Sequence, residues 1–201
     1  MKINLFFSIL FLAHIQATII PIILGIKSIN RFKNLKNNSL IPFGFMFLGL
    51  ASMFETIDHN YTNWIYVNHS SFFNWLFYSS LSLGLTTLSI SVIKNKFNIR
   101  LNLILCLGSI SSYFLIDKTT ALFFQAIISI CLIINWQRAF RDLLFIAYPI
   151  FGIIFTTLSG TYLSITGNQV WHLLIGPSGT ISVFTFYFVL KRSNNKSFKN
   201  F

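Results

Sequence analysis

Two short stretches of this sequence hold most of the side chains that could do chemistry. In the first, MFETIDHNYTNW, Glu55 and Asp58 stand beside His59 directly after an apolar run. Glu55 and His59 lie three and seven residues after Ser52, so these three share one face if the helix continues through His59. Because the whole chain holds only four Asp and Glu residues, a pair of carboxylates here favours a functional site. The alternative is a polar exit loop at the membrane surface over residues 55–70, where aromatic side chains are common.

The second stretch is TGNQVWHLLIGPSGT, residues 166–180. Asn168 and His172 are four residues apart and therefore lie one turn apart on a single helical face. Pro177 has no amide hydrogen, which frees a carbonyl one turn earlier and kinks the helix. The stretch predicts either a histidine that reaches into a polar pocket or a helix interface in which His172 is packed.

The elements that must position these groups are membrane-spanning helices. Hydrophobic residues make up 54% of the chain and charged residues 9%, whereas soluble domains have about 25% charged residues. A spanning helix needs about 20 mostly apolar residues. The sequence therefore predicts an all-α, polytopic integral membrane protein that forms a single transmembrane domain over residues 1–201. The seven predicted spans are residues 3–26, 40–57, 72–93, 101–116, 119–135, 143–165 and 170–190.

The basic residues set the orientation of these spans. Lys and Arg are enriched in cytoplasmic loops of membrane proteins, and all of them except Lys2 and Lys118 fall on one side of the predicted bundle. We therefore predict that the N-terminus is outside and that the C-terminus is in the cytoplasm. For a prokaryotic protein, the membrane would be the plasma or inner membrane. The net charge of +11 is then an orientation signal, and the expected partners are membrane lipids, not nucleic acid.

Titratable residues gather on the opposite, non-cytoplasmic side. The acids and histidines predicted there are Glu55, Asp58, Asp117, His59, His69 and His172. Ionisable groups in or near a membrane are costly, and they tend to face the bundle interior or a watery cavity. His14 and Gln125 lie inside predicted spans, where an uncharged side chain bonded across helices is common.

A zinc site is the chemistry that this set favours. If Glu55, Asp58, His59 and His172 converge, two or three nitrogen and oxygen ligands surround one point, which suits Zn²⁺ with an open position for water. The metal would lower the pKa of that water to about 7, and a spare carboxylate would act as general base. Asp117 would add a base or an orienting group, unless Lys118 beside it neutralises it.

Architecture and two motifs together resemble the CREST superfamily of seven-helix, metal-dependent membrane hydrolases. The motifs are Ser52 with Glu55 to His59, and Asn168-Gln-Val-Trp-His172. The last-helix motif of that family is His-x-x-x-His, and this chain has Asn168 in the first position. The resemblance implies a ceramidase-like hydrolase of lipid amides, with Ser52 among the catalytic groups and Asn168 among the metal ligands.

Two other classes of function fit the same residues. A small proton-linked transporter would also use intramembrane histidine and carboxylate groups, with a helix kinked at Pro177. A non-catalytic accessory subunit of a membrane complex needs none of them. The sequence leaves the substrate and the oligomeric state open.

Overall fold

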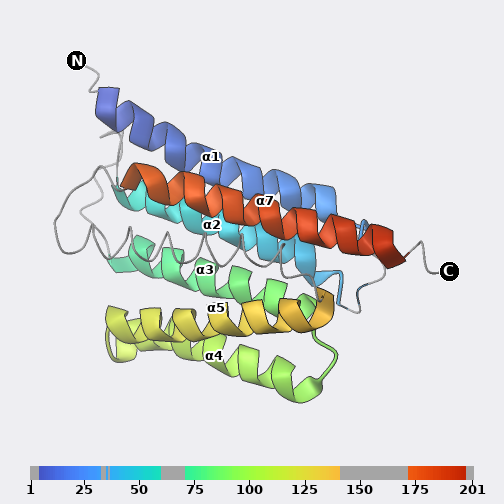
Figure 1. The fold of residues 1–201 in the computed structure, drawn as a ribbon. Coiled ribbons are helices and arrows are strands. Elements are labelled where there is room, and N and C mark those ends of the chain that lie inside the picture. The colour runs from blue at the N-terminus through green and yellow to red at the C-terminus, as the bar shows by residue number, and fades with distance from the viewer. Residues whose placement is uncertain (1–4, 33–34, 36, 60–70, 141–171, 198–201) are drawn as a thin grey trace.

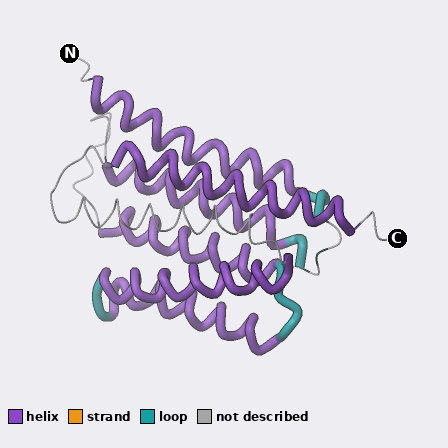
Figure 2. Tube along the Cα trace, viewed as in Figure 1, coloured by secondary structure: helices purple, strands orange, loops and turns teal. Residues whose placement is uncertain are grey.

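The computed structural model describes residues 5–32, 35, 37–59, 71–140 and 172–197, and this part of the chain is helical with short turns (Figures 1 and 2). Six helices make up this part of the chain. They are α1 (Leu5–Ser28), α2 (Leu40–His59), α3 (Ser71–Ser91), α4 (Lys96–Leu115), α5 (Lys118–Phe140) and α7 (His172–Ser197). The all-helical fold class predicted from the sequence is confirmed for these residues.

Neighbouring helices along the chain run in opposite directions from α1 to α5, and α7 runs in the same direction as α1 and α5 (Figure 1). Helix α2 packs between α1 and α3, while α3 also contacts α4 and α5, and α7 packs against α1. If one further helix spans the membrane between α5 and α7, these two helices must run in the same direction, as they do. The predicted span at 143–165 lies outside the described residues, so the count of seven stays a prediction.

The two ends of the bundle differ in charge. One end holds Glu55 and Asp58 at the end of α2 and Asp117 between α4 and α5, and we call it the acidic end. The other, which we call the basic end, holds the described Lys and Arg residues except Lys118. These basic residues are Lys27, Arg31, Lys94, Lys96, Arg100, Arg138, Lys191, Arg192 and Lys196. The charge segregation inferred from the loops is therefore present in the helix arrangement.

Four of the six described helices are long and apolar enough to cross a membrane: α1, α2, α4 and α5. Helix α3 contacts α2, α4 and α5, and hydrogen bonds join it to α4 and α5. Its Ser82 hydroxyl lies 2.8 Å from that of Ser109 on α4, and Gln125 on α5 donates to the Tyr78 carbonyl at 2.8 Å. Bonds of this kind hold helices together in lipid, where apolar burial between helices contributes little. They also confirm Gln125 as a cross-helix donor.

Helices α4 and α5 are longer than the spans predicted for them, because side chains at their ends have partners. Asn95 caps α4 by accepting the Phe97 amide at 2.9 Å, so the helix begins before residue 101. Helix α5 continues past residue 135 because its polar groups there bond to α3. Asn135 donates to the Ser89 hydroxyl at 2.9 Å, and Trp136 donates to the Leu88 carbonyl at 3.0 Å.

Glycines allow close approach at the contacts of α2. A Cβ on Gly49 would lie 2.8 Å from the Thr18 carbonyl of α1. On the other side of α2, a Cβ on Gly84 of α3 would lie 3.1 Å from the carbonyl of Gly44. Small residues at such positions are typical of helix interfaces in membranes.

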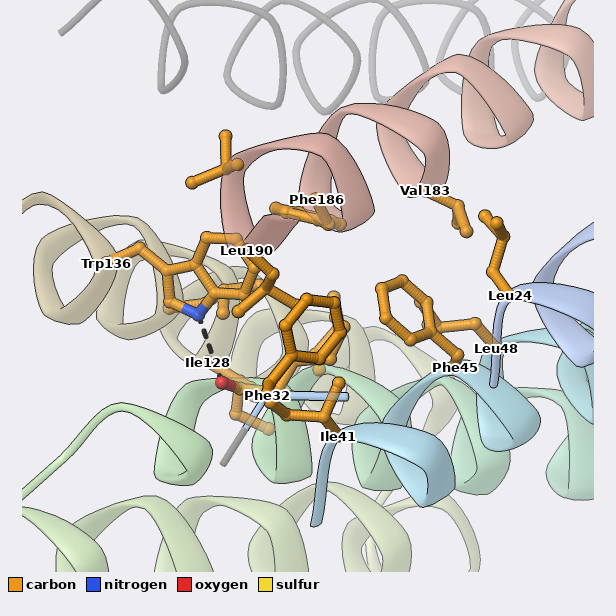
Figure 3. Close-up of a cluster of buried hydrophobic side chains, with 14 residues drawn as sticks. Leu24, Phe32, Ile41, Phe45, Leu48, Ile128, Trp136, Val183, Phe186 and Leu190 are labelled. Carbon is orange, nitrogen blue, oxygen red and sulfur yellow. Dashed lines mark hydrogen bonds between the residues drawn. The ribbon is translucent and has the colours of Figure 1, made fainter. Parts of the chain in front are cut away.

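A hydrophobic cluster fills the bundle toward the basic end (Figure 3). Trp136 of α5 is 2% exposed and meets the Phe186 ring of α7 at 5.0 Å between centroids. Phe45 of α2 and Leu24 of α1 enter the same cluster. Helices α1, α2, α5 and α7 thus share one core at this end.

Candidate functional site

The imidazole of His14 and the carboxylate of Glu55 join α1 to α2. His14 Nε2 lies 3.5 Å from Glu55 Oε2, and the two side chains are 1% and 18% exposed. The hydroxyl of Ser52, one turn before Glu55, donates to the backbone carbonyl of His14 at 3.1 Å. The face of α2 that carries Ser52 and Glu55 therefore meets α1 at His14.

A second chain of polar contacts starts at Asp58 on the last turn of α2. Asp58 is 6% exposed, and its Oδ2 accepts a hydrogen bond from the Asn74 amide of α3 at 3.4 Å. The Tyr113 hydroxyl of α4 donates to Asn74 Oδ1 at 2.9 Å. The other carboxylate oxygen, Asp58 Oδ1, is buried and accepts no hydrogen bond in the described part of the chain.

These contacts define the polar cluster: His14, Glu55, Asp58, Asn74 and Tyr113. Its members come from α1, α2, α3 and α4, and all lie in the half of the bundle nearer the acidic end. Glu55 and Asp58 are three residues apart on α2, so their side chains lie one turn apart near the same end of the helix. The polar cluster is the one place in the described residues where carboxylates are held inside the bundle.

Aromatic rings surround the polar cluster. Tyr78 and Tyr113 lie 5.9 Å apart between ring centroids, and Trp75 and Phe114 lie 5.4 Å apart. The ammonium group of Lys118, at the start of α5, lies 5.2 Å from the centroid of Tyr78. The faces of these rings carry negative charge density and attract cations.

Ser52 and Asp117, both predicted as catalytic groups, each make a hydrogen bond with a backbone group. Ser52 bonds to the His14 backbone. Asp117 is exposed in the turn before α5, where its Oδ1 accepts the backbone amide of Thr120 at 2.6 Å. This hydrogen bond from Thr120 lowers the pKa of Asp117 below its ordinary value. The catalytic roles of Ser52 and Asp117 stay predictions.

The predicted metal ligands fall largely outside the described residues. His69 and Asn168 lie in undescribed segments, and only the backbone is described for His59 and His172. His59 ends α2 and His172 begins α7, both at the acidic end. Among the described side chains, no three His, Cys, Asp or Glu residues come together as a metal site. The zinc site therefore stays a prediction.

Three members of the polar cluster were not predicted as site residues: His14, Asn74 and Tyr113. For His14, a bond across helices was the main expectation, with a functional role as the alternative. Asn74 could have been found from its place at the start of α3, which an antiparallel hairpin puts beside the end of α2. It also lies four residues before Tyr78 and shares a face with it.

A contact between α1 and α7 lies at the opposite, basic end. Arg31, just after α1, donates from Nη1 to the Tyr187 hydroxyl of α7 at 2.8 Å. The Tyr187 ring also meets Phe32 at 5.8 Å and Phe45 of α2 at 6.1 Å between centroids. Tyr187 thus contacts the end of α1 and the side of α2 at once, so its contacts depend on how α1, α2 and α7 are placed relative to one another.

Chemically, the polar cluster can hold a positive charge or a proton between helices. Its acceptors are carboxylate oxygens, and its donors are an imidazole, an amide and a phenol. Nothing in the described contacts sets up a nucleophile with its base.

Comparison with known proteins gives one family. Residues 5–196 match the model of the family designated 7TM_cyano, described as a seven transmembrane receptor. No curated protein and no solved structure matches the chain. The match, together with four helices able to cross a bilayer, makes the chain a multi-pass integral membrane protein. The resemblance to the CREST superfamily stays a prediction.

Proposed function

Because the chain belongs to the seven transmembrane receptor family, we propose that it is a membrane receptor that takes up its stimulus at the polar cluster. Binding or protonation there changes the packing of α1 and α2. The basic end, through the contact of α1 and α2 with Tyr187 of α7, delivers the response. The proposal includes a span at 143–165, an outward-facing acidic end and a cytoplasmic basic end.

The observation that carries this proposal is the burial of carboxylates between four helices. Glu55 faces His14 of α1, while Asp58 is linked through Asn74 to Tyr113 of α4. A change of charge at either acid alters contacts on neighbouring helices. A stimulus shifts a conformational equilibrium only by interacting differently with the two states, and a charged group in a desolvated interface supplies that difference.

Helix α2 is the element suited to transmit the change. It carries Glu55 and Asp58 at one end and Phe45, in ring contact with Tyr187, toward the other. Close contact at Gly49 couples it tightly to α1. Tightly packed helices shift in discrete steps instead of deforming continuously, so a displacement at the polar cluster reaches the basic end.

Hydrogen–deuterium exchange of the purified protein in lipid nanodiscs tests this function. Glu55→Gln removes one buried charge and keeps the shape of the side chain. We expect faster amide exchange in residues 27–32 and 185–192, at the basic end, than in the wild type. Asp117→Asn is the matched control, because it removes an exposed carboxylate from the same end of the bundle. Equal exchange at the basic end in wild type and Glu55→Gln would contradict the receptor function.

The zinc-dependent lipid-amide hydrolase remains a separate proposal, supported only by the two sequence motifs. It requires His59 and His172 to act as ligands with Asn168. Zinc content of the purified protein, compared with that of His172→Gln, tests it directly. A wild type that binds no stoichiometric zinc would exclude the hydrolase and leave the receptor unaffected.

A further inference from the structure

Asp58 holds a buried oxygen that the fold leaves without a donor. The side chain is 6% exposed, its Oδ2 has a long bond to Asn74, and its Oδ1 accepts no hydrogen bond in the described part of the chain. Leaving a buried carboxylate oxygen unpaired costs more than an ordinary hydrogen bond contributes. Such a group in a native protein indicates a missing partner.

The neighbouring donors are already committed to other acceptors. On α1, His14 faces Glu55, the other acid of α2. On α3 and α4, Asn74 donates to Oδ2, and Tyr113 donates to Asn74. The remaining partner of Asp58 must therefore come from outside these residues and bring a donor, a positive charge, or both.

The surroundings favour an organic cation over a metal ion. Tyr113 is linked to Asp58 through Asn74, and the Tyr78 ring stands beside that of Tyr113. Aromatic faces attract ammonium groups. The chain itself provides an example, since the Lys118 ammonium lies over the Tyr78 ring. A metal ion would need several more oxygen ligands than the described residues place around Asp58.

We propose that Asp58 is the anchor of a binding site for a small alkylammonium ligand. The ligand donates an N–H to Asp58 Oδ1 and packs its cationic head against the rings of Tyr78 and Tyr113. Lys118 limits access to one face of Tyr78. The inference rests on the proposed function for the location of the site, and it adds the chemical class of the stimulus.

Two other charged groups lie near this site: Glu55, which is 3.5 Å from His14, and Lys118, whose ammonium group lies 5.2 Å from the Tyr78 ring centroid. Glu55 is already paired with His14, which leaves Asp58 as the carboxylate open to the ligand.

Thermal unfolding of the full chain in nanodiscs, titrated with n-butylammonium chloride, tests the site. We expect a saturable rise in Tm for the wild type and for Asp117→Asn, and at least a tenfold loss of affinity in Asp58→Asn. The neutral isostere 1-butanol gives no saturable rise. Equal stabilisation of wild type and Asp58→Asn, or stabilisation by sodium chloride without any by butylammonium, would overturn the proposal.

A second variant keeps the test independent of how well Asp58→Asn folds. Lys118 is exposed, so Lys118→Gln should fold normally and open the ring face of Tyr78. Butylammonium should then bind a few-fold more tightly, and unchanged affinity would overturn the role of that ring.

The titration measures ligand binding alone, and hydrogen–deuterium exchange measures movement at the basic end. Saturable binding without movement at the basic end would refute the receptor function and keep the cation site. Movement at the basic end in Glu55→Gln, without butylammonium binding to the wild type, would refute the cation site and keep the receptor function.

Discussion

His14 and Glu55 show how a single pair of residues can make a charge tolerable inside a membrane bundle. The imidazole is almost fully buried, and the carboxylate lies against it across the α1–α2 contact. Removing one partner of a buried pair leaves the other uncompensated, which is strongly destabilising. The pair therefore links the stability of the α1–α2 contact to the charge at the polar cluster.

A double-mutant cycle on His14 and Glu55 measures this link. We expect His14→Gln and Glu55→Gln each to lower the free energy of unfolding, and the double variant to lose less than the sum. A coupling free energy of about 1–3 kcal/mol is typical of residues in one buried network. Unfolding in mixed micelles is the measurement. A coupling near zero would mean that the two side chains do not interact in the folded protein.

The lowered pKa of Asp117 determines how its contribution to stability changes with pH. Its pKa is lowered in the folded protein by the Thr120 amide, so its contribution to stability is present above the unfolded-state pKa, about 3.9. That contribution is lost as the pH falls through the lower, folded-state value. We expect Asp117→Ala to lower Tm at pH 7. The difference from wild type should shrink as the solution is acidified below pH of about 4.

Asp117→Asn is the control for that experiment, because asparagine is also a good acceptor at a helix N-terminus. It should keep most of the stability at pH 7 and remove its dependence on acid. A difference between wild type and Asp117→Ala that is the same at all pH values would contradict the capping role.

At the scale of residues, the sequence located the acids but not their partners. Glu55 and Asp58 were recognisable because carboxylates are rare in this chain and these two end an apolar run. Their contacts with His14 and Asn74 depend on how α1 and α3 are rotated about their axes. Hydropathy is nearly uniform around these helices, so rotation could not be read from the sequence.

At the scale of helices, the contact of α1 with α2 depends on the missing side chain of Gly49. Because a Cβ there would press on the Thr18 carbonyl, Gly49→Ala should force the helices apart. We expect a loss of about 1–3 kcal/mol, as for other overpacked sites. The measurement is the free energy of unfolding in nanodiscs or micelles.

Gly179→Ala on α7 is the matched control for Gly49. A Cβ on Gly179 would meet nothing within 4 Å, so the substitution should be neutral or slightly stabilising, as alanine favours helices. Equal effects of the two substitutions would show that the α1–α2 contact is looser than described.

Helices themselves were predictable because a bilayer dictates the length of an apolar segment, whereas helix ends were not. The extra turn at the start of α4 depends on the Asn95 cap, and the extension of α5 depends on bonds from Asn135 and Trp136 to α3. Both depend on single polar side chains. Mean hydropathy over a window of residues does not show the contacts of one side chain, so the helix ends could not be predicted from it.

For the whole molecule, the separation of charge between the ends predicts the orientation in the membrane. In a background without Cys106 and Cys131, single cysteines at Ile29, Lys94 and Lys191 should react with an impermeant thiol reagent only from the cytoplasmic side. A cysteine at Thr119 should react only from the opposite side. All these positions are exposed. Labelling of Lys94→Cys and Thr119→Cys from one side would contradict the transmembrane arrangement of α4.

The most direct test of the receptor function is the distance between the basic ends of α1 and α7 when the charge of the polar cluster changes. Spin labels at Lys27 and Lys191, both exposed, allow that distance to be measured by double electron–electron resonance in nanodiscs. We expect the distance distribution to shift in Glu55→Gln and to stay unchanged in Asp117→Asn. Superimposable distributions in wild type, Glu55→Gln and Asp117→Asn would contradict transmission from the polar cluster to the basic end.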